Sequence, residues 1–191
     1  MSESGAPGPR RLRLFFALWP SVAKRQFLAA STAAAIAQVD GQAVPAGNLH
    51  VTLAFLGMVP GRTFVHLVEI GGQGPYPAVE LAFDRLEYWA KPRVLVAMPS
   101  LVPASGLAIV DRLWGRIERL GFEREKRPWQ PHLTLVRKIR RRPPEGLRIS
   151  TAPAGGNADA RWTLALVEST THPSGVRYKA LAEWPLGNKG K

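Results

Sequence analysis

The chain has 191 residues and a formal net charge of +12 at pH 7, and it contains no cysteine, which excludes disulfides, thiolate metal ligands and cysteine nucleophiles. No apolar run approaches the ~20 residues that a membrane-spanning helix requires, and the N-terminal sequence MSESGAPGPRR lacks the apolar core of a secretory signal. We therefore expect a cytoplasmic protein with one folded domain over residues 11–186 and disordered tails over residues 1–10 and 187–191.

The first third of the chain predicts a strand, a helix and a second strand. Residues 11–18 alternate in the way typical of a strand with one buried face. That face carries Leu12, Leu14, Phe16 and Leu18. Ser21 is a suitable N-cap for an Ala-rich helix that ends near Val39. Residues 49–56 form the second predicted strand, which we expect to end at Gly57.

The middle of the chain predicts a short helix, a hairpin and a long amphipathic helix. Residues 64–70 are the only helical stretch expected in a segment rich in Gly and Pro. Residues 79–88 and 93–98 are typical of two strands joined by a turn. Apolar side chains then recur every three or four residues from 103 to 120, which predicts a helix with Gly121 as its C-cap.

The last third predicts one strand, a basic loop and a closing hairpin. Residues 132–136 are the strand, and residues 137–157 form a loop rich in Arg, Pro and Gly. Residues 162–169 and 176–184 form the hairpin around a turn at 172–175. The order of elements indicates an α+β fold with mainly antiparallel pairing.

Two short segments of the chain resemble each other. NLHVTLAF at 48–55 and QPHLTLVR at 130–137 share a His-x-Thr motif within an apolar strand, and each follows a strand and a helix. A single His-x-Thr is uninformative, because an isolated strand histidine is usually a packing residue. The repetition in equivalent contexts favours a paired site and a duplicated half.

Side chains two residues apart on a strand point to the same face. His50 and Thr52 therefore share one face, and so do His132 and Thr134. Two histidines can act as the general base and the general acid for the opening of a cyclic phosphate near neutral pH. The threonine hydroxyls can donate hydrogen bonds to the phosphate oxygens, on which negative charge grows in the transition state.

These motifs resemble those of the two-histidine phosphoesterases, most closely the LigT/ThpR branch of RNA 2′,3′-cyclic phosphodiesterases, once named 2′-5′ RNA ligases. The resemblance is carried by HVTLAFLG at 50–57 and PHLTLVRK at 131–138. RLRLFFALWP at 11–20 is similar to the opening strand of that branch, and residues 166–186 are similar to its closing hairpin. The resemblance extends over about residues 11–186.

The resemblance implies a bilobal α+β fold with pseudo-twofold symmetry, in which two mainly antiparallel sheets face each other across a central cleft with helices on the outside. It implies hydrolysis of a 2′,3′-cyclic phosphate, on an RNA end or a nucleotide, to a 2′-phosphate without a metal or another cofactor. His50 and His132 match the catalytic residues. Thr52, Thr134 and Arg137 match the residues that bind the phosphate.

Arg137 raises a geometric difficulty. It lies an odd number of residues after His132, so on a regular strand its side chain would face away from the site. It reaches the phosphate only if the strand ends or bulges near Val136, and otherwise it is a solvated strand-end arginine. The sequence does not decide which histidine is the acid, and we expect His132 to activate water and His50 to protonate the 3′ oxygen.

Four aromatic residues are candidates for stacking on the terminal base, although most strand aromatics belong to a core. They are Phe16, Phe55, Trp129 and Tyr178. The other two histidines, His66 and His172, have no carboxylate at a spacing that would build a metal site with the motif histidines, so we expect no metal.

The positive charge is concentrated in one stretch of the chain. Residues 124–148 hold nine Lys and Arg against two Glu, which favours a polymeric anion such as RNA as the partner. We expect the protein to be a monomer. The alternative for this loop is a charged, flexible surface.

Two other functions stay open: a non-catalytic RNA- or nucleotide-binding module on the same fold, and a phosphodiesterase for small cyclic phosphates or 2′-5′ oligonucleotides.

Overall fold

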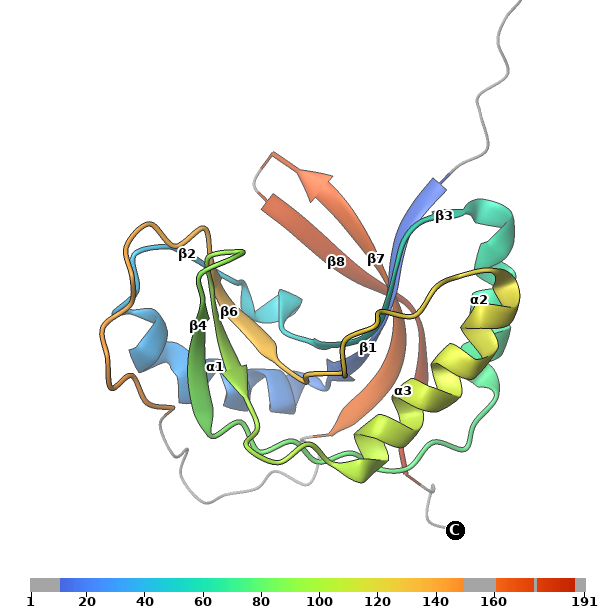
Figure 1. The fold of residues 1–191 in the computed structure, drawn as a ribbon, viewed down its shortest axis with the longest axis horizontal. Coiled ribbons are helices and arrows are strands. Elements are labelled where there is room, and N and C mark those ends of the chain that lie inside the picture. The colour runs from blue at the N-terminus through green and yellow to red at the C-terminus, as the bar shows by residue number, and fades with distance from the viewer. Residues whose placement is uncertain (1–10, 150–160, 174, 188–191) are drawn as a thin grey trace, which may run out of the picture.

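The computed structural model describes residues 11–149, 161–173 and 175–187, so the N-terminal tail, most of the C-terminal tail and part of the basic loop expected from the sequence lie outside it. Over these residues the chain forms two four-stranded antiparallel sheets and three α-helices (Figure 1). The α+β fold and the mainly antiparallel pairing expected from the sequence are confirmed.

The first sheet contains the two ends of the chain. Its strands, in spatial order, are β3 (Val51–Pro60), β1 (Arg11–Pro20), β7 (Trp162–His172) and β8 (Gly175–Pro185). The second sheet is built from the middle of the chain. Its strands, in spatial order, are β2 (Gln42–Ala43), β6 (Leu133–Arg137), β5 (Val94–Met98) and β4 (Arg85–Trp89). Each His-x-Thr motif therefore belongs to a different sheet.

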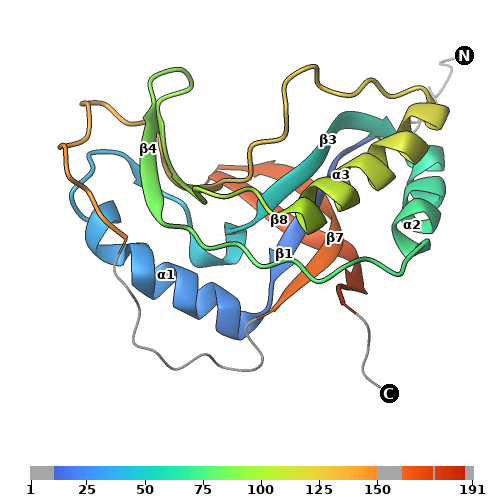
Figure 2. The ribbon, with the colours of Figure 1, turned by 60° about the horizontal axis from the view of Figure 1, so that its bottom comes forward.

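Three helices pack against the sheets. They are α1 (Val22–Ile36), α2 (Phe64–Gly72) and α3 (Ala104–Ile117). Single 3-10 turns lie at Ala46–Asn48, Gly61–Thr63 and Glu118–Leu120. Helix α1 contacts β1 and β6, whereas α2 contacts β7, β8 and α3. Figure 2 shows α1 at one end of the molecule and the α2–α3 pair at the other.

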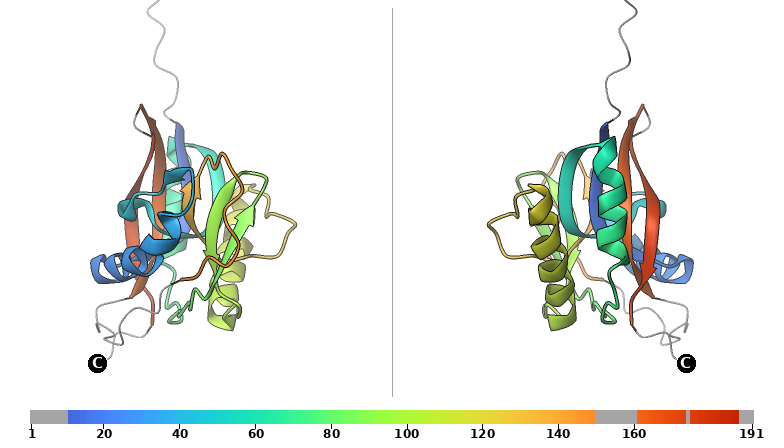
Figure 3. Two further views of the ribbon diagram at one scale, coloured as in Figure 1. Left: turned by 90° about the vertical axis from the view of Figure 1, so that its left-hand side faces the viewer. Right: turned by 90° about the vertical axis from the view of Figure 1, so that its right-hand side faces the viewer.

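One hydrophobic core joins the two sheets. Its fully buried side chains come from β1 and β7 of the first sheet and from β5 and β6 of the second, as Leu14, Leu164, Leu95 and Leu133 illustrate. Figure 3 shows the two sheets side by side. This shared core fixes the strands that carry the two histidine motifs relative to each other.

The helix ends follow the local signals of the sequence. The Ser21 hydroxyl accepts a hydrogen bond from the backbone N–H of Lys24 at 3.2 Å, so Ser21 caps α1 as expected. Gly121 adopts the left-handed conformation, with φ +85°, after the last turn that follows α3, so it is the expected C-cap. Helix α1 ends at Ile36, three residues before the expected Val39.

Two strand predictions are wrong in extent. Strand β3 continues through Gly57 to Pro60, because Gly57 adopts φ +69° in an irregular part of the β1–β3 ladder instead of ending the strand. Residues 79–84 belong to no strand, and β4 begins at Arg85. Val79 and Leu81 pack into the core without strand pairing, which explains the alternation of apolar residues there.

Candidate active site

A cavity of about 260 Å³ lies between the two sheets and contains both motifs. All five residues expected from the sequence to form the catalytic and phosphate-binding groups line it: His50, Thr52, His132, Thr134 and Arg137. The first two come from the β3 segment and the other three from the β6 segment. Residues far apart in the sequence are thus brought into one groove, and we call it the central groove.

His50 lies just before β3 among aromatic rings. Its Nδ1 lies 2.7 Å from the carbonyl oxygen of Asn48. Its ring lies 4.9 Å from that of Phe15 and 4.8 Å from that of Tyr178, measured between centroids. Burial among these rings is the main cause that lowers the pKa of His50 to about 4, and the nearby Arg137 and His132 act in the same direction.

His132 is held in the same way just before β6. Its Nδ1 lies 2.8 Å from the carbonyl oxygen of Gln130, and its ring centroid lies 4.6 Å from that of Trp89. Burial also lowers the pKa of His132, and the guanidinium of Arg137 lowers it further. Both imidazoles are therefore mainly neutral at pH 7.

The two carbonyl contacts fix the tautomer of each ring. A carbonyl oxygen can only accept, so Nδ1 carries the proton in both His50 and His132. In the neutral rings, Nε2 then carries the lone pair and is the atom able to exchange a proton with a bound molecule. The carbonyl is supplied in each case by the residue two positions earlier, so the motif itself sets this orientation.

Both motifs carry a β-bulge at the same position. In the pairing of β1 with β3, the register passes from Ala54 to Thr52 and leaves Leu53 without a partner residue. In the pairing of β5 with β6, it passes from Val136 to Thr134 and leaves Leu135 without one. Each bulge directly follows the threonine of its motif, which strengthens the case for a duplicated half.

The bulge in β6 resolves the geometric difficulty of Arg137. One extra residue after Thr134 changes the alternation of the strand, so Leu135 and Val136 are both buried and Arg137 lines the central groove. The same change in β3 brings Phe55 to the groove. Phe55 thus occupies the position in the first motif that Arg137 occupies in the second.

A cation nevertheless lies at the Phe55 position. The guanidinium carbon of Arg13 lies 5.1 Å from the centroid of the Phe55 ring, and Arg13 also lines the central groove. The sequence reasoning did not single out Arg13. The predicted strand could nevertheless have indicated that Arg13 faces away from the core, because Arg13 lies on the opposite face to Leu14 and Phe16.

The proposal that Phe16 stacks on a base is wrong. Phe16 is fully buried on the core face of β1, where its ring lies 6.2 Å from that of Trp184. Phe15 faces the groove instead, because successive residues of a strand point to opposite faces. Only 3% of Phe15 is exposed, so it supports His50 from beneath and offers no open face to a base.

Two of the three other aromatic candidates line the central groove. Tyr178 is half-buried and lines the central groove beside His50. Phe55 is 43% exposed in the same groove. Trp129 lies outside the central groove, and its indole N–H donates a hydrogen bond to the carbonyl oxygen of Thr52 at 2.8 Å. Trp89, which the sequence reasoning did not propose for the site, is the last residue of β4 and packs on His132.

Asn48 links the first motif to the closing hairpin. Its side-chain amide donates to the carbonyl oxygen of Val176 at 2.8 Å, and its amide oxygen accepts from the backbone N–H of Tyr178 at 3.4 Å. Its backbone carbonyl also orients His50. Asn48 therefore holds Tyr178 beside His50, a role that the sequence did not reveal because the partner strand is 128 residues away.

The remaining histidines lie away from the central groove. His66 is in α2 and His172 ends β7, and neither lines the groove. Within the described part of the chain, no three His, Asp or Glu side chains are grouped so that they could bind a metal ion together. No helix among the described residues is long and apolar enough to cross a membrane.

Comparisons with known proteins agree with this geometry. The family described as LigT like Phosphoesterase matches residues 20–96. The RNA 2′,3′-cyclic phosphodiesterase of Escherichia coli (strain K12) is 29% identical to this chain over 179 residues, which cover 91% of this chain and 96% of that protein.

Solved structures show the same architecture. The crystal structure of E. coli LigT complexed with 3′-AMP superposes with a TM-score of 0.76 and 28% identity, over 94% of this chain and 100% of that chain. A protein of Thermus thermophilus, TT0787, superposes with a TM-score of 0.64 over 94% of this chain and 100% of that chain. At 22% identity, this second likeness concerns the fold alone.

Proposed function

We propose that the chain, which is similar to the LigT-like phosphoesterases over most of its length, hydrolyses 2′,3′-cyclic phosphates, on RNA ends or nucleotides, to 2′-phosphates. One observation carries the proposal above all. His50 and His132 line the same groove from opposite sheets, each with Nδ1 held by a backbone carbonyl and Nε2 left to exchange protons. Binding alone does not require two such titrating groups, and this argues against a non-catalytic module.

The proposed reaction needs one proton removed and one supplied. The base takes a proton from water as the water oxygen attacks phosphorus, and the acid gives a proton to the 3′ oxygen as its bond to phosphorus breaks. The product carries a 2′-phosphate and a free 3′ hydroxyl. Because the two histidines end the reaction with exchanged protonation states, a return of one proton through solvent restores the starting state.

The surroundings of the two rings favour one assignment of acid and base. His50 is the more strongly desolvated, with a pKa of about 4, so it is neutral and ready to accept a proton across the physiological range. We therefore propose His50 as the base and His132 as the acid, which reverses the assignment expected from the sequence. The anionic phosphate, once bound, raises the pKa of both rings and so increases the protonated fraction of His132.

The phosphate-binding groups surround the same groove. Thr52 and Thr134 each lie two residues after a histidine and can donate hydrogen bonds to the non-bridging oxygens. Arg137 supplies a positive charge, which is worth most where charge develops in the transition state. We propose these three as the groups that hold the phosphate in line for attack.

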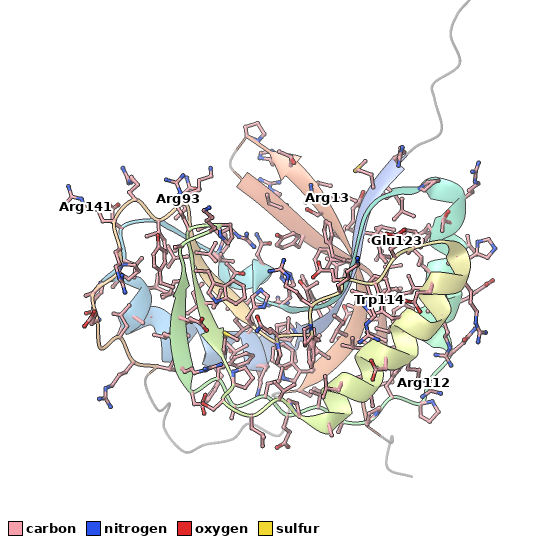
Figure 4. The ribbon with its side chains drawn as sticks, viewed as in Figure 1. Arg13, Arg93, Arg112, Trp114, Glu123 and Arg141 are labelled. Atoms are coloured by element: carbon pink, nitrogen blue, oxygen red, sulfur yellow. The ribbon has the colours of Figure 1, made fainter. Side chains whose placement is uncertain are left out.

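An RNA substrate is favoured over a small cyclic phosphate by the charge around the groove. Arg13 and Arg137 line it, and Lys91 and Arg93 lie on the exposed turn between β4 and β5. Arg93 and Arg141 lie on the same side of the molecule (Figure 4). A polymeric anion can contact several such cations at once, so binding should weaken steeply as salt increases.

The test is identification of the product. Purified protein is incubated with adenosine 2′,3′-cyclic phosphate, and the monophosphate formed is assigned by phosphorus NMR. We expect 2′-AMP, and we expect turnover to survive EDTA because both proton transfers belong to imidazoles. Formation of 3′-AMP alone would contradict the regiochemistry, and no turnover of this nucleotide or of a cyclic-phosphate RNA end would contradict the proposal.

A further inference from the structure

A second cavity, of about 220 Å³, adjoins the central groove. The two cavities share Thr52, Phe55, Trp89 and His132, so they form one continuous depression. The second cavity, which we call the side pocket, extends from the groove toward α3. Thr52, His132 and Gln130, whose carbonyl orients His132, lie at the edge that it shares with the groove, and the proposed reaction gives the rest of the side pocket no role.

The side pocket combines apolar surface with charged residues whose net charge is positive. Val110 and Trp114 of α3 and the indole of Trp129 supply apolar surface. The exposed side chains of Arg124, Glu125 and Arg127 also line the pocket and bring two positive charges and one negative charge. Trp114 and Glu123 lie on one side of the molecule, opposite Arg93 and Arg141 (Figure 4). The basic stretch at residues 124–148 is therefore divided in space. Arg124 and Arg127 line the side pocket, whereas Arg141 lies on the opposite side of the molecule.

The segment that carries these charged residues is fixed at both ends. Arg124 forms an ion pair with Asp111 of α3 at 2.7 Å, and Trp129 donates its indole N–H to the carbonyl oxygen of Thr52 at 2.8 Å. Arg127 lies between these anchors. It forms no ion pair or side-chain hydrogen bond with any residue that the structure describes, so its charge is available to an anion.

We propose that the side pocket binds the nucleotide on the 5′ side of the cyclic-phosphate end of an RNA substrate. Arg127 contacts the phosphate that links the last two nucleotides, and the base of the penultimate nucleotide packs on the half-buried indole of Trp129. Phe55, 43% exposed and common to both cavities, separates the two nucleotides. The inference rests on the proposed function, and it makes the enzyme selective for chains over single nucleotides.

The experiment compares a mononucleotide with a dinucleotide. The ratio of kcat/KM for ApA 2′,3′-cyclic phosphate to that for adenosine 2′,3′-cyclic phosphate is measured in the wild type, in Arg127→Ala and in Lys126→Ala. The wild-type ratio should be at least about ten, from one stacked base and one phosphate contact. Arg127→Ala should lower this ratio at least about fivefold.

Lys126→Ala is the matched control, because it removes one positive charge from the same segment at a residue that does not line the pocket. It should leave the ratio within about twofold of the wild-type value at moderate salt. A wild-type ratio near one, or equal effects of the two substitutions, would overturn the side-pocket proposal while leaving the hydrolase intact. Absence of turnover on both substrates would instead overturn the proposed function.

Discussion

His50 packs against both Phe15 and Tyr178, whereas His132 packs beside Trp89, and this difference underlies the proposed roles of the two histidines as base and acid. The shared feature, Nδ1 on a backbone carbonyl, makes both rings competent for proton transfer. The unshared feature, deeper desolvation, makes His50 the poorer proton donor at neutral pH. The sequence motif could predict the two histidines but not the difference in their burial. That difference arises because Phe15 of β1 and Tyr178 of β8 pack on His50.

A substrate whose leaving group needs no proton separates the two roles. Against a nucleoside p-nitrophenyl phosphodiester, His132→Ala should lose less than about tenfold in kcat, although it loses about 10²–10⁴-fold on the cyclic phosphate. His50→Ala should be severely impaired on both substrates, because water still requires a base. The opposite pattern, with His50→Ala tolerated on the aryl ester, would restore the assignment expected from the sequence.

Phe15 and Phe16 show how one position along a strand decides between core and site. The alternation of β1 had already placed Phe16 on the face of Leu14 and Leu18, and that face is the core. The position of an aromatic ring near the end of a strand is therefore not by itself evidence of a role in binding. Arg13 and Phe15 could have been chosen by the same alternation, had the buried face been identified first.

Phe16→Ala should therefore act on stability and not on substrate binding. Loss of this fully buried ring should lower the free energy of unfolding by about 3–5 kcal/mol. Phe55→Ala, at a ring that is 43% exposed, is the comparison and should cost less than about 1 kcal/mol. Urea denaturation measures both, and a stable Phe16→Ala protein with raised KM would contradict the assignment of Phe16 to the core.

At the scale of elements, the β-bulges after Thr52 and Thr134 determine which side chains enter the groove. The sequence showed that Arg137 required such an irregularity but could not show that it existed. A bulge depends on the register of the partner strand, and for β6 that partner is β5, about 40 residues earlier. The equivalent bulge in β3 was not foreseen, although Phe55 lies as far after His50 as Arg137 lies after His132 and needed the same irregularity to reach the groove.

The link between Asn48 and β8 predicts a coupled change in rate and pKa. Asn48→Ala removes the hydrogen bonds to Val176 and Tyr178, so Tyr178 should move and admit water to His50. The pKa of His50 should then rise from about 4 toward 6.5, because desolvation is the main cause of its depression. An NMR titration follows the pKa, and we expect kcat/KM to fall about tenfold.

Thr170→Val is the control for this prediction. It removes another side-chain hydrogen bond of the same hairpin, from Thr170 to the carbonyl oxygen of Arg177, at an exposed position. It should change neither the pKa of His50 nor kcat/KM. If Asn48→Ala lowered activity with the His50 pKa unchanged, the residue would act on the fold of the hairpin and not on the surroundings of His50.

For the whole molecule, the pKa of His50 makes stability depend on pH. The folded pKa of about 4 lies below the ordinary value of 6.5, so the unfolded chain binds more protons between these values. The contribution to stability is therefore complete above pH 6.5 and is lost as pH falls toward 4. The lowered pKa of His132 acts in the same direction.

Urea denaturation from pH 7 to pH 4 checks this dependence. The free energy of unfolding should fall on acidification, with a contribution from His50 on the order of 2 kcal/mol. His50→Gln, which cannot titrate, should show a flatter profile over the same range. Parallel profiles for the two proteins would mean that His50 has an ordinary pKa in the folded state.

The arrangement of the two sheets was available from the sequence only through family resemblance. Local patterns gave the helices, their caps and most strands, because these depend on neighbouring residues. They gave neither the short strand β2 nor the order β3-β1-β7-β8, in which the first strand pairs with β7 from the last third of the chain. The central groove and the side pocket depend on that order, since their walls come from both sheets and α3.

Turnover of a 2′,3′-cyclic nucleotide by His50→Ala, by His132→Ala and by the double variant tests the paired site most directly. Each single substitution should lower kcat by at least about 10²-fold, because each removes one proton transfer. The double variant should lose little more than the weaker single variant, since the two histidines act as a unit. Near-normal turnover by either single variant, with the fold intact, would contradict the two-histidine mechanism.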